Sequence, residues 1–125
     1  MRSVIAVGVA GSVGAIARYG LEGFVSRRTL GALPWGTFIV NISGSFALGV
    51  IFAALVEGEV VAAPWLRNGL TIGLIGAFTT FSTFTLETLR LVEEGSYLLA
   101  AMNAVGSLVL GLVAVFVGVV VGRAV

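Results

Sequence analysis

The sequence predicts an all-α membrane protein: a single transmembrane domain, residues 1–125, with four membrane-crossing helices. The first supporting observation is composition, because 58% of the 125 residues are hydrophobic and only 10% are charged, against about 25% charged in soluble domains. The second is a mean hydropathy of +1.13. The third is the clustering of the charges, which leaves four uncharged stretches at residues 3–17, 29–56, 68–86 and 95–122.

Each uncharged stretch forms the centre of one predicted helix. A helix needs about 20 largely apolar residues to cross the hydrocarbon core, and the last three stretches are long enough. The first is shorter, but its helix can continue past Arg18 and Glu22, which are four positions apart and can face each other. We therefore predict transmembrane helices at residues 3–25, 34–56, 66–90 and 96–122.

Several residue types are missing, and their absence narrows the function. The chain has no Cys, His, Asp, Lys or Gln, which excludes disulfides, thiol nucleophiles, histidine acid–base chemistry, lysine Schiff bases and Cys- or His-ligated metals. Ser and Thr are plentiful, but no side chain is present that would activate one as a nucleophile. The net charge of +1 gives no basic surface for nucleic acid. We expect neither an enzyme nor a nucleic-acid-binding protein.

The arginines are balanced between the two sides of the membrane. Four crossings place both termini on one side, together with the connection between the second and third helices. That side carries Arg2, Arg67 and Arg123, and the other carries Arg27, Arg28 and Arg90, with Arg18 deeper in the membrane. The positive-inside bias that normally fixes orientation is therefore close to zero. One alternative is that a single arginine or the insertion machinery of the host sets the orientation. The other is that the chain inserts in both orientations, and that oppositely oriented copies pair about an axis in the membrane plane.

Glycine is abundant, at 18 of 125 residues, about twice the usual 7%. In lipid, helices associate through close contact of small residues. Pairs spaced for such contact are Gly11 with Ala15, Gly69 with Gly73, and Gly118 with Gly122. Packing within one subunit accounts for some of these pairs, but we expect an oligomer rather than a monomer.

Polar residues within the predicted helices recur every four positions and so share one helix face. These stripes are Thr37, Asn41 and Ser45 in the second helix, Thr79, Thr83 and Glu87 in the third, and Asn103 and Ser107 in the fourth. Such residues either hydrogen-bond across helices or line a hydrated path. Three stripes, two of them with an asparagine near mid-membrane, favour the path.

The chemistry of these stripes suits a small anion. Their amides and hydroxyls can donate hydrogen bonds, and Arg18 adds a positive charge near one end of the first helix. The ring edges of Phe81 and Phe84 carry partial positive charge. A cation path would instead carry acidic side chains or arrays of exposed carbonyls.

The segment TTFSTFT, residues 79–85, places five hydroxyls in an uncharged membrane stretch. Thr, Ser and Phe are mediocre helix formers, and hydroxyls compete for backbone hydrogen bonds. With Gly73 and Gly76 just upstream, the third helix can break around residues 76–80, where unwound carbonyls would coordinate a cation. A continuous helix with hydroxyls bonded to its own backbone fits the composition equally well.

Three segments resemble the signatures of a known family, the Fluc fluoride channels, also called the CrcB or camphor-resistance family. They are GAIARYG (residues 14–20), PWGTFIVNISGSFALG (34–49) and GLIGAFTTFSTFTLET (73–88), and the resemblance covers nearly the whole chain. The third segment is the most specific. One departure is Ala10-Gly11, where many members have paired glycines. The fourth helix matches more loosely, through Asn103, Ser107 and Gly111.

The resemblance implies an antiparallel, dual-topology homodimer with two fluoride pathways and a third helix broken mid-membrane. A structural sodium ion would lie at the two-fold axis, held by the backbone carbonyls of Gly76 and Thr79 from both subunits. Phe81 and Phe84 would contact fluoride through their ring edges, and Arg18 would lie at the vestibule. The remaining pathway residues would be Asn41, Thr37, Ser82, Thr83, Ser107 and Glu87.

The function implied by the resemblance is a fluoride-selective channel in a prokaryotic cell membrane, which passively exports fluoride and keeps its cytoplasmic concentration low. The main alternative is a dual-topology, proton-coupled small multidrug transporter. That class needs a titratable carboxylate deep in the first helix, whereas Glu22 lies near the far end of that helix beside Arg18. A purely structural membrane subunit would need no polar stripes.

Overall fold

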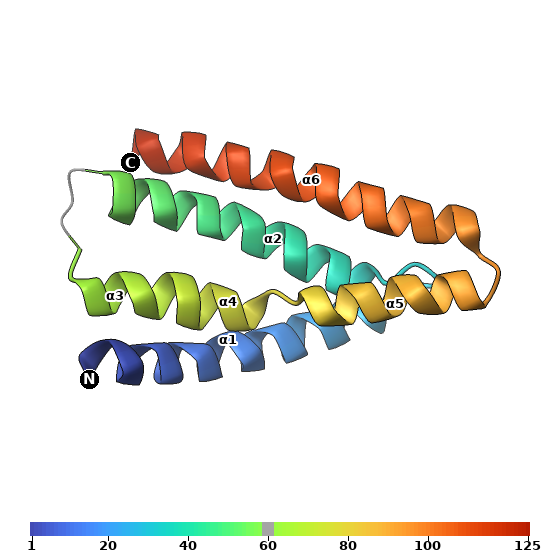
Figure 1. Cartoon of the computed structure of the whole chain (residues 1–125), viewed down its shortest axis with the longest axis horizontal. Coiled ribbons are helices and arrows are strands. Elements are labelled where there is room, and N and C mark those ends of the chain that lie inside the picture. Colours follow the sequence, from blue (N-terminus) through green and yellow to red (C-terminus); the bar gives the residue numbers. More distant parts are fainter. Residues whose placement is uncertain (59–61) are drawn as a thin grey trace.

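The computed structural model describes residues 1–58 and 62–125, and its long helices lie side by side (Figure 1). Within these described residues, four helical spans are long and apolar enough to cross a membrane: Arg2–Ser26, Trp35–Glu57, Pro64–Glu93 and Tyr97–Ala124. Their ends lie one to three residues from the predicted ones. The prediction of four apolar helices is confirmed.

The spans differ in regularity. The first and last are single helices, α1 (Arg2–Ser26) and α6 (Tyr97–Ala124). In the second span, α2 (Trp35–Phe52) continues into a π-helical turn, η1 (Ala53–Glu57). The third is divided into α3 (Pro64–Asn68), the π-helical η2 (Gly69–Ile75), α4 (Gly76–Phe78) and α5 (Phe81–Glu93).

One glycine fixes the turn between α5 and α6. Gly95 has a φ of +77°, a conformation that other residues adopt at a cost. The Ser96 N–H donates to Leu91 O at 2.8 Å and the Gly95 N–H to Val92 O at 3.0 Å. This pair of bonds is the Schellman arrangement that ends a helix at a left-handed glycine.

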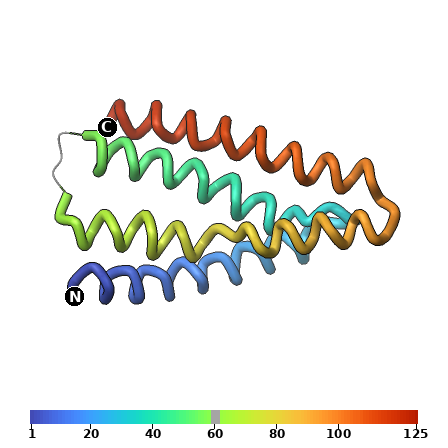
Figure 2. The backbone as a smooth tube through the Cα atoms, viewed as in Figure 1, coloured from blue at the N-terminus to red at the C-terminus, as the bar shows by residue number. Residues whose placement is uncertain are grey.

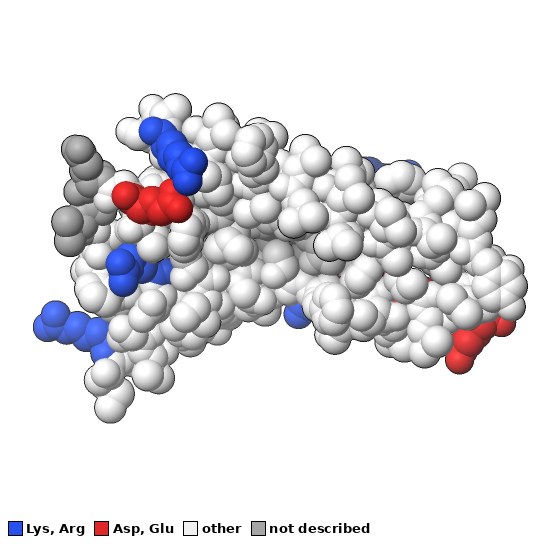
Figure 3. Space-filling model, turned by 45° about the horizontal axis from the view of Figure 1, so that its top comes forward, with Lys and Arg blue, Asp and Glu red and all other residues white. Residues whose placement is uncertain are grey.

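The two ends of the molecule carry its charge. Both termini lie at the end where α2 and η1 lead toward α3, and the turn between α5 and α6 lies at the opposite end (Figures 1 and 2). On the face shown in Figure 3, most charged atoms lie toward these ends and the broad middle is almost entirely uncharged. This distribution suits a bundle that crosses a bilayer.

Glycines allow close contact within the subunit. A β-carbon added at Gly73 would lie 2.7 Å from Val7 O, and one at Gly14 would collide with Leu74 O, so α1 and η2 meet backbone to backbone. In the same way, Gly118 lies against Phe46 O, joining α6 to α2. Two of the predicted small-residue pairs, those beginning at Gly69 and Gly118, therefore pack within one chain.

Candidate functional site

The third span has two extended residues between α4 and α5. Thr79 has φ −80° and ψ 156°, and Thr80 has φ −146° and ψ 110°. The helical hydrogen-bond pattern is interrupted there, so the peptide groups of these residues need other partners. In a membrane those partners must come from protein.

Asn41, from α2, supplies both partners of the Thr80 peptide. Its Nδ2 donates to Thr80 O at 3.0 Å, and its Oδ1 accepts from the Thr80 N–H at 2.7 Å. The side-chain amide thus replaces a neighbouring peptide group. Since Nδ2 carries two hydrogens, one N–H remains after this pairing.

Thr80 itself begins α5. Its Oγ1 accepts a hydrogen bond from the Thr83 N–H at 3.4 Å and donates to Thr83 Oγ1 at 2.9 Å. Threonine is a preferred residue at this capping position, and Thr80 is 6% exposed. Thr80 lies outside the predicted polar stripes, although a threonine directly before a helix start is a recognisable signal once the start is known.

The extended residues also change the hydrogen bonding of Gly76 O and Thr79 O, the two carbonyls predicted to bind sodium. In a continuous helix the Thr80 N–H would bond to Gly76 O and the Thr83 N–H to Thr79 O. Instead, these amides bond to Asn41 Oδ1 and Thr80 Oγ1. Among residues 1–58 and 62–125, no group of three or more acidic, His or Cys side chains could hold a metal.

Two phenylalanines lie at the start of α5. The rings of Phe81 and Phe84 have centroids 5.9 Å apart and are tilted by 46°. Phe81 is 77% exposed on the single chain, and Phe84 is partly buried. The two predicted aromatic residues are therefore neighbours, and the first projects from the bundle surface.

A second link joins α2 to α5, from the turn before Asn41 on α2 to Glu87, further along α5 than Thr80. Thr37 Oγ1 donates to Glu87 Oε1 at 2.8 Å, and Thr37 is 2% exposed. The other carboxylate oxygen, Oε2, is buried and has no hydrogen-bond partner in the described part of the chain. Thr83 and Glu87 lie on α5, but the expectation that Thr79 shares their helix face is wrong, because Thr79 is extended and precedes α5.

The fourth span reaches α5 through Asn103. Its Nδ2 donates to Thr88 Oγ1 at 2.9 Å, and Asn103 is 5% exposed. Ser107, one turn further along α6, has a buried Oγ without a hydrogen-bond partner among the described residues. Polar side chains from α2 and α6 thus converge on α5.

Besides Ser107, two predicted polar residues make no side-chain hydrogen bond to this cluster among the described residues. Ser82 is exposed, and its carbonyl oxygen accepts a bond from Thr85 Oγ1 at 2.9 Å. Arg18 is partly buried in α1, and the expected pairing with Glu22 is not formed. Where the chain is described, the one ion pair joins Arg123 and Glu57 at 3.0 Å.

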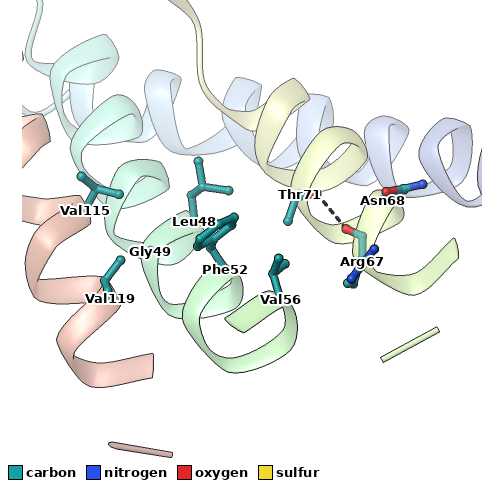
Figure 4. Close-up of a pocket in the computed structure, with 9 residues that line it drawn as sticks. All are labelled: Leu48, Gly49, Phe52, Val56, Arg67, Asn68, Thr71, Val115 and Val119. Carbon is teal, nitrogen blue, oxygen red and sulfur yellow. Dashed lines mark hydrogen bonds between the residues drawn. The ribbon is translucent and has the colours of Figure 1, made fainter. Parts of the chain in front are cut away.

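A separate cavity lies outside the cluster. It has a volume of about 300 Å³ and lies where α2 and η1, α6, and the start of the third span meet (Figure 4). Its lining is mostly apolar, with Arg67, Asn68 and Thr71 on the side of the third span. Thr71 Oγ1 donates to Arg67 O at 2.8 Å, a bond within the third span. None of the predicted site residues lines this cavity.

Comparison with known proteins gives a consistent result. The family model described as CrcB-like protein, Camphor Resistance (CrcB), matches residues 5–119. A Nitratidesulfovibrio vulgaris protein named fluoride-specific ion channel FluC is 46% identical over 98% of this chain and 98% of its own length. Proteins of the same name from Geobacter sulfurreducens and Geotalea uraniireducens are 42% and 43% identical, over 98% and 99% of both chains. The resemblance found in the motifs is confirmed, and this chain belongs to the CrcB-like, camphor-resistance family.

Proposed function

We propose that the protein is a fluoride-selective ion channel through which fluoride leaves the cytoplasm passively. Relatives at 46% and 42% identity over nearly their whole length carry the name fluoride-specific ion channel. The family is one of ion channels, and the protein is not an enzyme. Within this chain, the proposal rests on the convergence of polar side chains from α2 and α6 on α5, beside the Phe81–Phe84 ring pair.

The mechanism follows from the hydration of fluoride. Fluoride is small and holds its water tightly, so a narrow path must replace that water with other donors and still release the ion. The ring edges of Phe81 and Phe84 and the remaining N–H of Asn41 are such donors. Ser107 suits the same role, because its buried hydroxyl has no partner among the described residues. The other pathway residues are Thr37, Ser82 and Thr83, with Arg18 at the vestibule and Glu87 near the end of the pathway.

The channel is an antiparallel homodimer with two pathways. The balance of arginines between the two ends allows both orientations in the membrane. Gly76 and Phe81 are exposed on the single chain, which leaves the surface on either side of the extended residues open to a second copy. The third spans of two copies would cross there, at the middle of the bilayer.

A structural sodium ion would lie at the centre of this dimer. The carbonyl oxygens of Gly76 and Thr79 would hold it, two from each subunit. The amides that would occupy these oxygens in a continuous helix bond instead to Asn41 and Thr80. The same two extended residues would therefore leave carbonyl oxygens free to bind a cation. They would also place the ring edges of Phe81 and Phe84 where an anion can contact them.

The biological role is to keep cytoplasmic fluoride low. Fluoride that enters as hydrogen fluoride dissociates inside the cell, and the channel lets the anion return down its electrochemical gradient. The named relatives are bacterial, so we assign the protein to the plasma membrane of a prokaryote, as a multi-pass protein with four spans.

Ion efflux from liposomes tests the proposal. Purified protein is reconstituted, and fluoride release is followed with a fluoride electrode, with chloride release measured in parallel. Rapid fluoride loss without chloride loss is expected. A folded dimer that releases no fluoride would show that the protein alone does not conduct it, and equal loss of both ions would contradict selectivity.

A further inference from the structure

We infer that Asn103 is a positioning residue, which holds Phe84 in place by hydrogen bonding to Thr88. The inference rests on the proposed function, since it concerns the ring that fluoride would pass. Asn103 lies on α6 and Phe84 on α5, and the two are joined through one hydroxyl. Asn103 lies in one of the polar stripes, but neither Asn103 nor Thr88 is among the residues proposed to line the pathway.

The connection is a short chain of two hydrogen bonds. Asn103 Nδ2 donates to Thr88 Oγ1 at 2.9 Å, and Thr88 Oγ1 donates to Phe84 O at 2.8 Å. Asn103 is 5% exposed, so water does not compete strongly for its amide. Movement of α6 relative to α5 is thereby coupled to the main chain that carries the Phe84 ring.

The direction of these bonds explains why an amide is needed. The Thr88 hydroxyl has one hydrogen, which it gives to Phe84 O. Its partner on α6 must therefore be a donor, and the NH₂ group of asparagine is one. Leucine at position 103 would fill similar space without donating. An aspartate carboxylate would only accept, and would draw the hydroxyl hydrogen away from Phe84.

The position of this link within α5 supports the inference. Side chains of α2 hold α5 at Thr80, through Asn41, and at Glu87, through Thr37. In residues 1–58 and 62–125, the Asn103–Thr88 bond is the one side-chain hydrogen bond from α6 to α5. The Asn103–Thr88 bond holds α5 from the side of α6, whereas the bonds of Asn41 and Thr37 hold it from the side of α2.

The test uses four variants and one matched control in reconstituted liposomes. Asn103→Leu removes the donor, Thr88→Val removes the relay, Thr88→Ser keeps the hydroxyl, and a double variant combines Asn103→Leu with Thr88→Val. The control is Thr71→Val, because Thr71 makes the same kind of bond, to the carbonyl four residues earlier at 2.8 Å, without an interhelical donor (Figure 4). Fluoride efflux, the fluoride-to-chloride flux ratio and dimer elution are measured for each.

We expect Asn103→Leu and Thr88→Val each to lower fluoride efflux about tenfold, equivalent to about 1.4 kcal/mol at the barrier. The flux ratio should fall while the dimer still elutes normally. Because both changes break one chain, the double variant should be within about twofold of the slower single variant. Thr88→Ser and Thr71→Val should match the wild type.

The outcomes separate this inference from the proposed function. Wild-type protein that passes no fluoride would contradict the channel itself. Normal efflux in Asn103→Leu, beside a conducting wild type, would overturn the positioning role. Losses that multiply in the double variant would also overturn it, since they would show that Asn103 acts independently of Thr88.

Discussion

At the scale of single residues, Asn41 takes the place of a main-chain peptide for Thr80. Both of its polar groups bond to that residue, across 39 positions of sequence. The proposed pathway role would use the N–H that remains, so the side chain would serve both the structure and conduction. Substitutions that affect folding and flux to different degrees can separate these functions.

Replacing Asn41 tests the structural function. Asn41→Leu leaves the Thr80 N–H and C=O without partners, which we expect to lower the free energy of unfolding by about 1–3 kcal/mol and to reduce fluoride efflux. Thermal unfolding in detergent and liposome efflux measure the two effects. Ser43→Ala on the same helix is the control, because that hydroxyl bonds only to carbonyls of its own helix, Ile39 O and Val40 O. Unchanged unfolding in Asn41→Leu would contradict the peptide-replacing role.

The aromatic pair gives a second prediction at this scale. Phe81→Ile or Phe84→Ile keeps an apolar side chain but removes the ring edge, and should reduce fluoride flux roughly tenfold, equivalent to about 1.4 kcal/mol at the barrier. The dimer should persist in both variants. Phe116→Ile, at an exposed ring on α6, is the control. Wild-type flux in the combined Phe81→Ile and Phe84→Ile variant would rule out the aromatic contact with fluoride.

At the scale of elements, the third span shows how far sequence reasoning reaches. Its apolar stretch and its approximate ends followed from the spacing of charges. The extended conformation of Thr79 and Thr80 did not follow from the spacing of charges, because a hydroxyl-rich segment can either break or continue a helix. The peptide of Thr80 is paired by Asn41 on another helix. A contact made across helices leaves no local pattern in the segment itself.

The sequence predicted which residues form the polar stripes, but it did not predict their hydrogen-bond partners. The four-residue spacing placed Thr37 and Asn41 on one face of α2, and both bond to the α5 region. The same spacing failed for Thr79, because it assumed an uninterrupted helix. Periodicity therefore identifies which faces are polar only within a regular element. It does not identify their partners.

Gly44 tests the contact between α2 and the interrupted segment. A β-carbon there would collide with Thr79 Cγ2 and lie 3.1 Å from Phe78 Cδ1. Gly44→Ala should therefore push the segment away from Asn41, with a cost of about 1–3 kcal/mol and a loss of fluoride flux. Gly8→Ala is the control, since no atom lies within 4 Å of its added β-carbon. Equal stability of the two variants would show that α2 need not approach Thr79 closely.

At the scale of the whole molecule, the glycine pairs and the arginine balance have different consequences. The pairs beginning at Gly69 and Gly118 are occupied within the subunit, so they do not account for a dimer. The arginines, three at each end with Arg18 deeper, bear directly on orientation. An antiparallel dimer requires both orientations in the same membrane, and this requirement can be tested by changing the charge at one end.

One added arginine at either end should bias insertion. Ser3→Arg adds charge at the end that carries the termini, and Ser96→Arg adds it at the turn between α5 and α6, so the two variants should insert in opposite orientations. Each alone should give little fluoride efflux from cells, because same-facing copies cannot form the antiparallel pair. Expressed together they should restore it. Accessibility of a terminal tag from outside the cell reports the orientation of each variant. Full efflux from a variant shown to face one way would exclude the antiparallel dimer as the conducting form.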